Sequence, residues 1–547
     1  MDPHDYSWIL AVSFILSCLN AYALGANDVG NAFATAVAAK TLTLRQACAI
    51  ALFTEFGGGV LLGASVADTI KGNIIDTSLF TSNPALLMLA MMCALCGSSF
   101  LVLAATLKGF PVSSTHAIIG AIIGTGIAAF GVDTVDWGWT GVGKIVASWF
   151  ISPFLSGFIS AAIFLISKYT VLVKPNSYAR ALKVIPVFFF LTFLIVTFFI
   201  LYDGAPDLNL KNENPGMIVG IVFGVGIVAA VFAYFYLVQV IRLRVEIRPQ
   251  RPLYQDLLYF YFGRPHLPAY VGDDAALPLC GNEPEHAEPH HDEAPQPLIP
   301  EVSRSNSYGS TTDEPLAHGS VGGVNEAKPP QVDAAQKSWF GKALAAASSG
   351  MDKDIVSAES EAQAHMMSQA TKFETRTEET YSFLQVLSCV SMSFAHGSND
   401  VGNAVGPISA VWYIWQNAAV AGTKTDVPVW HLAIGGACIN LGLLTLGWRV
   451  MKTLGNKLTY QSPSRGFCTE IGAILTVLTA SKLGLPVSTT HAITGSSAFV
   501  GLASSGSAKT VNWRLLGWCF LSWIVTVPIA ALISGLLFAM IVNSPRV

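Results

Sequence analysis

Long apolar runs are the feature that most limits how this chain can fold. Apolar windows of about 18 or more residues mark helices that can span a lipid bilayer. Only 12% of the 547 residues are charged, about half the fraction of a typical soluble domain. The chain is therefore predicted to be an all-α polytopic membrane protein. We read 12 membrane segments, several interrupted by Gly, Pro or polar residues, near 7–26, 47–66, 85–107, 112–130, 142–167, 184–202, 216–241, 382–414, 429–451, 467–484, 487–505 and 513–542.

Charged residues near the ends of these segments predict the orientation. The N-terminus is acidic, and basic and acidic ends alternate along the chain, with Lys71 as an exception. Because cytoplasmic loops carry an excess of Lys and Arg, we expect both termini outside and the central segment in the cytoplasm. We expect the chain to lie in the plasma membrane, although an organelle membrane fits the same pattern.

The charges divide the chain into three parts. We predict a first membrane half over 1–241, a large cytoplasmic loop over 242–380 and a second membrane half over 381–547. The loop contains stretches such as "EPEHAEPHHDEAPQP", which cannot bury enough apolar surface to fold alone, so it is expected to be mostly disordered. Regulatory partners would bind there. No basic stripe indicates nucleic acid.

Two motifs recur in the same order in the two halves. "GANDVGNA" (25–32) precedes "PVSSTHAIIG" (111–120), and "GSNDVGNAVG" (397–406) precedes "PVSTTHAITG" (486–495). Seven predicted crossings separate the copies, and because seven is odd, the halves enter the membrane from opposite sides. The sequence thus predicts two inverted-topology repeats with broken or re-entrant helices. In transporters of this layout the sites lie near the midplane, between the repeats.

Each proline-led motif carries three hydroxyl residues at the predicted start of a helix. Free N–H groups and the positive end of the helix dipole bind oxyanions there. Two such starts converging from opposite sides would hold a small tetrahedral anion, whereas the simpler alternative is ordinary capping by Ser and Thr. The predicted substrate ligands are Ser113, Ser114, Thr115, Ser488, Thr489 and Thr490, together with Asp28 and Asp400.

Each Asn-Asp motif places an acid inside an apolar segment, where a charge is costly and indicates function. Carboxylate, amide and backbone oxygens suit Na⁺ or a proton. The alternative, a packing face of small residues, does not explain the acids. The predicted cation ligands are Asn27, Asp28, Asn399 and Asp400, with Na⁺ at Asp28 and Asp400, and Asn31 and Asn403 in support. Gly25, Gly30, Gly397 and Gly402 are expected to break both helices.

The charge balance predicts coupled transport. No Lys or Arg lies within either pair of motifs, and a helix dipole contributes only about half a charge. Bound cations must therefore offset the anion, and an acid beside it favours an anion that still carries a proton, such as hydrogen phosphate, over sulfate.

Two further acids and two histidines also lie in apolar segments. Glu55 and Glu470 are predicted to be transport-critical, in a cation path or proton relay. His116 and His491 follow the hydroxyl triplets. We expect them to support the site as hydrogen-bond donors, with proton carriage as the alternative.

With these paired motifs the chain resembles the inorganic phosphate transporter (PiT) family of sodium- or proton-coupled permeases. The resemblance covers about 1–241 and 382–547. It implies an elevator-like transporter that imports phosphate by cation symport, is homodimeric and has no catalytic cofactor. It also implies the roles given above to the hydroxyl triplets, the Asn-Asp pairs and the two glutamates. His396 stands before the second motif as "HGS", a departure that leaves Asn399 and Asp400 in place. Na⁺ is favoured over H⁺ as the coupling ion.

Two other functions remain as alternatives. An intramembrane hydrolase is disfavoured because there is no G-x-S-x-G elbow, and each His follows its Ser too closely along one helix to form a triad. "GWTGVGKI" (138–145) imitates a nucleotide-binding loop but has Ile145 in place of the Mg²⁺-binding hydroxyl. A phosphate-sensing receptor that signals through the loop is compatible with the same motifs.

Overall fold

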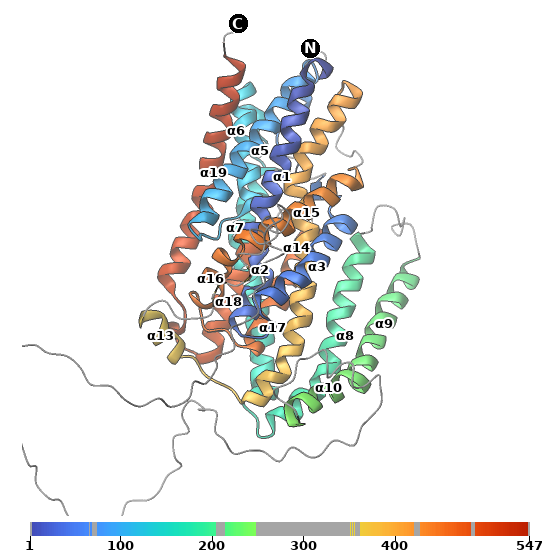
Figure 1. Ribbon diagram of the computed structural model, residues 1–547, viewed down its shortest axis with the longest axis vertical. Coiled ribbons are helices and arrows are strands. Elements are labelled where there is room, and N and C mark those ends of the chain that lie inside the picture. Colours follow the sequence, from blue (N-terminus) through green and yellow to red (C-terminus); the bar gives the residue numbers. More distant parts are fainter. Residues whose placement is uncertain are drawn as a thin grey trace, which may run out of the picture.

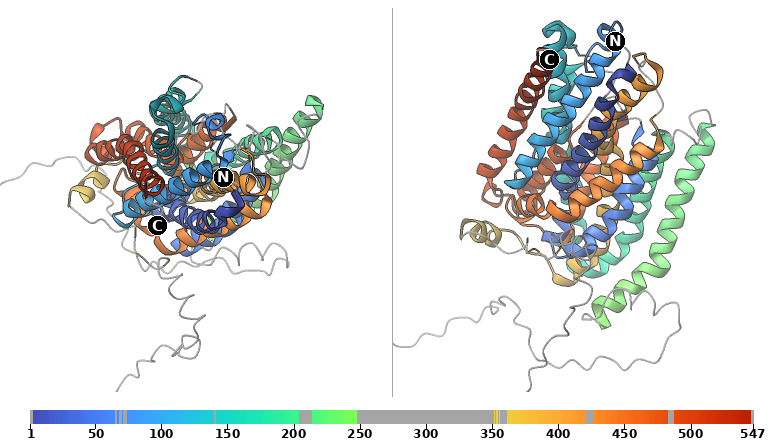
Figure 2. Two further views of the ribbon diagram at one scale, coloured as in Figure 1. Left: turned by 90° about the horizontal axis from the view of Figure 1, so that it is seen from above. Right: turned by 45° about the horizontal axis from the view of Figure 1, so that its top comes forward.

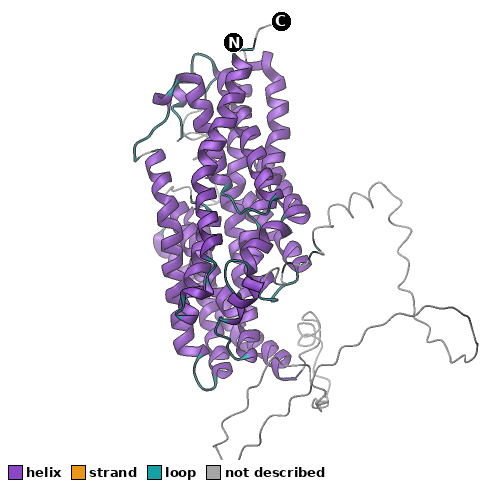
Figure 3. Ribbon diagram, turned by 90° about the vertical axis from the view of Figure 1, so that its left-hand side faces the viewer, coloured by secondary structure: helices purple, strands orange, loops and turns teal. Residues whose placement is uncertain are grey.

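The fold is helical throughout the part that can be described. The computed structural model describes residues 3–64, 66–67, 70, 74–139, 141–203, 214–247, 351, 353, 355, 361–420, 427–482 and 487–544. Within them the only extended pairings are two isolated β-bridges, Ile75 with Val135 and Thr459 with Val511, and helices make up the rest of the ordered framework (Figure 3). Most of the predicted loop, 248–350, lies outside the described residues, and so does the prediction of disorder made for it.

The helices before the loop are α1 (Ser7–Asn27), α2 (Gly30–Ala38), α3 (Leu44–Leu62), α5 (Pro84–Leu107), α6 (Ser114–Phe130), α7 (Val142–Ser167), α8 (Ser177–Asp203), α9 (Pro215–Phe232) and α10 (Val238–Arg242). Those after it are α13 (Glu361–Ser368), α14 (Thr375–Asn417), α15 (Val429–Leu446), α16 (Trp448–Asn456), α17 (Pro463–Lys482), α18 (Thr489–Ser505) and α19 (Trp513–Val542). Short 3₁₀ or π turns connect several of them, among them η2 (Thr77–Phe80), η3 (Val132–Thr134) and η10 (Ala508–Thr510).

Each of the 12 predicted membrane segments contains one of these helices. Seven stretches of the described chain are long and apolar enough to cross a bilayer, and the shorter α6 is also apolar. The chain therefore has the helical, membrane-spanning fold that was predicted, whereas the number of crossings stays a prediction.

Local sequence signals place several helix starts. Thr43 and Gln46 form a capping box at the start of α3. Pro84 and Pro215 occupy the first turns of α5 and α9, where a missing N–H costs nothing. Glu374 precedes α14 and accepts hydrogen bonds from the hydroxyls of Ser177 and Thr377. The Ser177 bond lowers the pKa of the exposed Glu374 and links the start of α8 to that of α14.

The two halves have equivalent helix–helix contacts. In the first half α1 lies against α15 and α5, and α6 lies against α5 and α19; in the second half α14 lies against α3 and α17, and α18 against α17 and α7. Glycines mark equivalent contacts: a Cβ on Gly25 would meet the backbone of Ile439, and a Cβ on Gly397 would meet that of Glu55. The two halves therefore interlock, since α7 packs on the second half and α19 on the first.

The two ends of the bundle differ. Both termini lie at one end, and α10 and α13, which flank the undescribed segment, lie at the other (Figure 1). The helices α8 and α9 pack on each other at the edge of the bundle (Figure 2). The repeated motifs occupy the centre, where their side chains are buried.

Candidate functional site

The first Asn-Asp motif lies at a helix break. The helix α1 ends at Asn27, Asp28 closes it with its N–H on the carbonyl of Leu24, and α2 begins at Gly30. The Asn27 amide donates to the Thr106 hydroxyl at 2.8 Å and to the carbonyl of Phe110 at 3.1 Å, and its oxygen accepts the N–H of Val112 at 3.1 Å. The break predicted for this copy is confirmed. Asn27 holds the segment that leads into α6.

The second Asn-Asp motif does not break its helix. The helix α14 runs without interruption from Thr375 to Asn417, so the break predicted at Gly397 and Gly402 is wrong. The glycines serve close packing instead. A Cβ on Gly397 would lie 2.2 Å from the backbone oxygen of Glu55, and one on Gly402 would lie 2.8 Å from the backbone nitrogen of Ala67. The two copies are therefore alike in sequence and different in backbone.

The hydroxyl triplets lie at two buried helix starts. Ser113 caps α6, where its oxygen accepts the N–H of His116 at 3.3 Å, and Ser488 caps α18 and accepts the N–H of His491 at 3.4 Å. The other four hydroxyl residues occupy the first turns of the two helices. All six are at most 3% exposed: Ser113, Ser114, Thr115, Ser488, Thr489 and Thr490.

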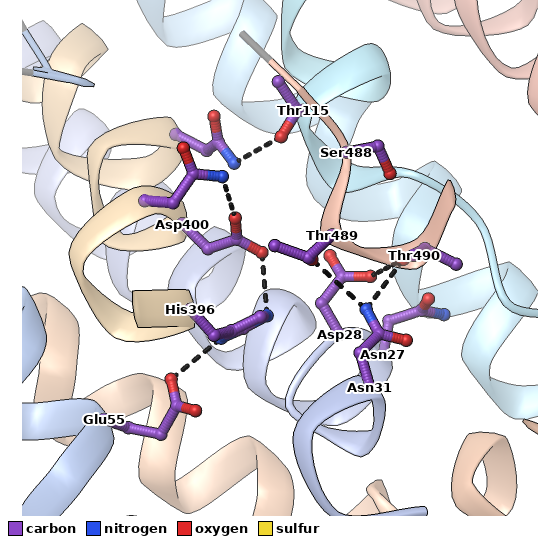
Figure 4. Close-up of polar contacts among 12 residues, drawn as sticks. Asn27, Asp28, Asn31, Glu55, Thr115, His396, Asp400, Ser488, Thr489 and Thr490 are labelled. Atoms are coloured by element: carbon purple, nitrogen blue, oxygen red, sulfur yellow. Dashed lines mark hydrogen bonds and ion pairs between the residues drawn. The ribbon is translucent and has the colours of Figure 1, made fainter. Parts of the chain in front are cut away.

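Each Asn-Asp motif contacts the hydroxyl triplet of the other half (Figure 4). Asn31 donates to the hydroxyls of Thr490 at 2.8 Å and Thr489 at 3.3 Å. The Thr490 hydroxyl donates to Asp28 at 3.0 Å. In the opposite sense, Asn403 donates to the Thr115 hydroxyl at 3.0 Å. The fold thus brings both motif pairs into one buried polar cluster.

A histidine joins two of the predicted acids. His396 lies between Glu55 and Asp400, with Nδ1 2.8 Å from Glu55 Oε2 and Nε2 2.9 Å from Asp400 Oδ2 (Figure 4). An imidazole donates to both sides only when both nitrogens carry a proton. Ser393 also donates to Glu55 at 2.8 Å, and Asn399 donates to Asp400 at 2.8 Å. Glu55 is therefore connected to the central cluster through His396.

Glu470 lies in a separate polar cluster. Its carboxylate accepts hydrogen bonds from the hydroxyls of Thr35 and Ser388, from Gln385 Nε2 at 3.4 Å and from Cys389 Sγ at 3.2 Å. Glu470 and Ser388 are both fully buried. Thr35 is on α2, one turn beyond Asn31, so α2 carries residues of both clusters.

His116 and His491 lie behind the hydroxyl triplets, facing each other. Their ring centroids are 4.6 Å apart. Neither ring nitrogen of His116 has a hydrogen-bond partner among the described residues. The expectation that His116 is a hydrogen-bond donor stays a prediction, and ring packing is the role that the described residues show.

Unpartnered oxygens face the cluster. The side-chain oxygens of Asn31 and Asn403 are buried and accept no hydrogen bond from any described group, although both amide nitrogens are engaged. Among the described residues, no Lys or Arg makes a hydrogen bond or ion pair with the Asn-Asp motifs or the triplets. The cluster therefore offers cation ligands and hydroxyl donors together.

The contact residues that the sequence interpretation missed include His396, Gln385, Ser388 and Thr35. His396 had a detectable signal, because it stands four residues before Asp400 and an i, i+4 pair shares one helix face. The other three had none, because their connection to Glu470 exists only through tertiary packing.

A bundle of membrane helices with a buried cluster of acids, amides and hydroxyls at its centre defines a membrane transporter. The family model of the phosphate transporter family matches residues 24–534 of this chain, so the chain belongs to that family and is a transporter rather than an enzyme. The hydrolase alternative is thereby excluded.

Known proteins agree with this assignment over their whole lengths. The chain is 36% identical to the phosphate-repressible phosphate permease of Neurospora crassa, over 100% of this chain and 99% of that protein. It is 31% identical to sodium-dependent phosphate transporter 2 of Bos taurus, over 99% of each. A solved structure of a sodium-dependent phosphate transporter superimposes with a TM-score of 0.68 at 27% identity, covering 98% of this chain and 100% of that one.

Proposed function

We propose that this chain imports inorganic phosphate across the plasma membrane by symport with Na⁺. The proposal rests on hydrogen bonds between the two halves at the centre of the molecule. Each Asn-Asp motif is hydrogen-bonded to the hydroxyl triplet of the other half, Asn31 to Thr490 and Asn403 to Thr115. A substrate held by both triplets would therefore contact both halves at once.

Phosphate is assigned to the two helix starts. Six hydroxyls and the free N–H groups of the first turns of α6 and α18 supply donors from two directions. Asp28 and Asp400 border the same space, and a carboxylate beside a protonated anion accepts a hydrogen bond from the proton that the anion carries. Hydrogen phosphate has that proton and sulfate at neutral pH does not, so the site favours phosphate.

Na⁺ is assigned to the oxygens of the Asn-Asp motifs. Carboxylate and amide oxygens are suitable hard ligands, and Asn31 and Asn403 each have an unpartnered side-chain oxygen. Three acids but a single imidazole lie in the cluster, so a bound phosphate would add to a negative excess that cations must offset. Relatives that are named sodium-dependent transporters support Na⁺ over H⁺.

Glu55 and Glu470 are proposed to lie on the cation path. Glu55 reaches the cluster through His396, and Glu470 lies in a polar pocket that shares α2 with the Asn-Asp motif. The two acids would provide two separate cation-binding positions, one on each side of the central cluster.

The proposed molecule is an inverted-repeat homodimer that works by an elevator-like movement. The paired helix contacts support the repeats, since Gly25 on Ile439 matches Gly397 on Glu55. The termini at one end and the loop-flanking α10 and α13 at the other support outside termini and a cytoplasmic loop. The loop would bind regulatory partners, and a sensing role through it would accompany transport.

Uptake into proteoliposomes tests the coupling. We expect an inward Na⁺ gradient to drive accumulation of labelled phosphate, and a pH gradient alone to drive little. Accumulation with the pH gradient only would assign H⁺ as the coupling ion, and accumulation with neither would refute symport. Equal competition by sulfate and phosphate would refute the assignment of the anion.

A further inference from the structure

Four aromatic rings form a continuous row directly behind the hydroxyl triplets. Trp149 on α7 contacts His116 with ring centroids 4.9 Å apart, His116 contacts His491 at 4.6 Å, and His491 stacks on Trp523 of α19 at 3.9 Å. His116 and His491 are fully buried and Trp523 is 2% exposed. We call these four residues the ring row.

The ring row joins equivalent positions of the two halves. His116 and His491 stand at the same place in "PVSSTH" and "PVSTTH". Trp149 stands four residues before Pro153, where Gly495 packs, and Trp523 stands four residues before Val527, where Gly120 packs. The row thus crosses the interface between the halves symmetrically, with the two imidazoles at its centre.

The ring row is mechanically connected to the hydroxyl triplets. The backbone N–H of His116 donates to the Ser113 hydroxyl at 3.3 Å, and that of His491 donates to Ser488 at 3.4 Å. Each imidazole is therefore in the same first turn as the hydroxyls of its triplet. The helices α6 and α18 pack mainly on other helices, α6 on α5 and α19 and α18 on α7 and α17, so the two rings are a direct contact between the two starts.

The His116 imidazole makes no hydrogen bond to a described residue. Buried polar atoms are nearly always hydrogen-bonded, yet both nitrogens of His116 and the indole nitrogens of Trp149 and Trp523 have no partner among the described residues. What distinguishes imidazole from phenylalanine here is its smaller ring.

We propose that His116 and His491 are positioning residues whose ring contact sets the spacing between the two hydroxyl triplets, and thereby the size of the tetrahedral anion that the transporter prefers. The proposal rests on the anion site assigned above. Phosphate and arsenate share shape and charge, and arsenate has longer bonds to oxygen. The spacing would thus favour phosphate over arsenate.

The test is the ratio of the apparent KM for arsenate to that for phosphate, measured in proteoliposomes with a fixed Na⁺ gradient. His116→Phe keeps a packed ring but enlarges it, which separates the starts. We expect this ratio to fall by about three- to tenfold, the range that corresponds to one aromatic contact, with phosphate Vmax changed less than KM. His491→Phe is expected to shift the ratio in the same direction.

Phe130→Leu is the matched control. Phe130 is on the other end of α6 and makes a similar edge-to-face contact with Phe80, with centroids 4.8 Å apart. Its substitution should leave the ratio unchanged. If the ratio is unchanged in both His variants while transport is retained, the ring row serves only packing and the proposal is overturned.

Two further variants keep the result decisive. If neither His variant reaches the membrane, Trp523→Phe replaces them, because it reduces a ring of the same row, and an unchanged ratio would again overturn the proposal. Thr490→Val tests the underlying site, and we expect it to weaken phosphate and arsenate together. If Thr490→Val weakens neither, the anion site is wrong; if it weakens both and the His variants do not shift the ratio, only the spacing inference is wrong.

Discussion

At the scale of residues, identical letters in the two motifs have different partners. Asp28 accepts from Thr490 of the other half, whereas Asp400 is held by Asn399 and His396 of its own helix. Asp28 therefore borders the triplet directly, whereas the imidazole of His396 contacts Asp400. The two acids are expected to contribute unequally, with Asp28 more dependent on a bound cation.

Asp28→Asn tests that dependence. The substitution preserves size and removes the charge, so we expect normal membrane insertion and an apparent Na⁺ affinity reduced by at least about tenfold, as for loss of a supporting metal contact. Na⁺-dependent phosphate uptake in proteoliposomes measures it. Wild-type uptake by this variant would remove Asp28 from the mechanism.

Glu470→Gln separates transport from substrate binding. Glu470 contacts Thr35, Gln385, Ser388 and Cys389 but none of the triplet residues. We expect Na⁺-driven uptake to fall by about tenfold or more, on the same basis as above, while equilibrium phosphate binding to the purified protein is retained. Glu361→Gln, on the exposed start of α13, is the control. A parallel loss of phosphate binding would place Glu470 in the anion site.

At the scale of elements, close helix contacts position the site. Gly397 allows the backbone of α14 to meet that of α3 beside Glu55, and Gly25 allows α1 to meet α15. Because the contact is with backbone atoms, a larger residue cannot be accommodated by a rotamer change. Gly397 thereby positions Glu55 against His396 and does not break α14.

Gly397→Val is expected to destabilise the protein by about 1–3 kcal/mol, the usual cost of overpacking, and to reduce uptake by displacing α3 and Glu55. Thermal unfolding in detergent and uptake measure the two effects. Gly220→Val on α9 is the matched control, because no atom of the described residues lies within 4 Å of a Cβ there. Equal stability of the two variants would contradict the close contact.

At the scale of the whole molecule, the bundle has two distinct ends. The termini share one, and the helices flanking the central segment share the other (Figure 1). We therefore predict that the termini and this segment face different compartments.

Epitope tags test the orientation. A tag after Val547 should be accessible to antibody on intact cells, and a tag inserted near 320 should be accessible only after permeabilisation. An unmodified transporter with normal phosphate uptake is the reference for both. The reverse pattern would invert the proposed topology.

The sequence by itself determined the class of fold and predicted the residues of the candidate site. Apolar runs require helices in a bilayer, because backbone polar groups must be satisfied within the segment, and all 12 predicted segments contain a helix. The two motif pairs identified both hydroxyl triplets and both acids, because buried charges and hydroxyls at helix starts are costly without a function.

Only the tertiary structure decided how those residues meet. Each Asn-Asp motif contacts the hydroxyl triplet of the other half, Glu55 is connected to Asp400 through His396, and Glu470 has its own polar cluster. Most of these contacts join residues that are hundreds of positions apart in the sequence. The sequence also predicted two helix breaks where there is one, because a glycine permits a break and equally permits close packing. The neighbouring helix decides between them, and α3 lies against Gly397, which keeps α14 continuous.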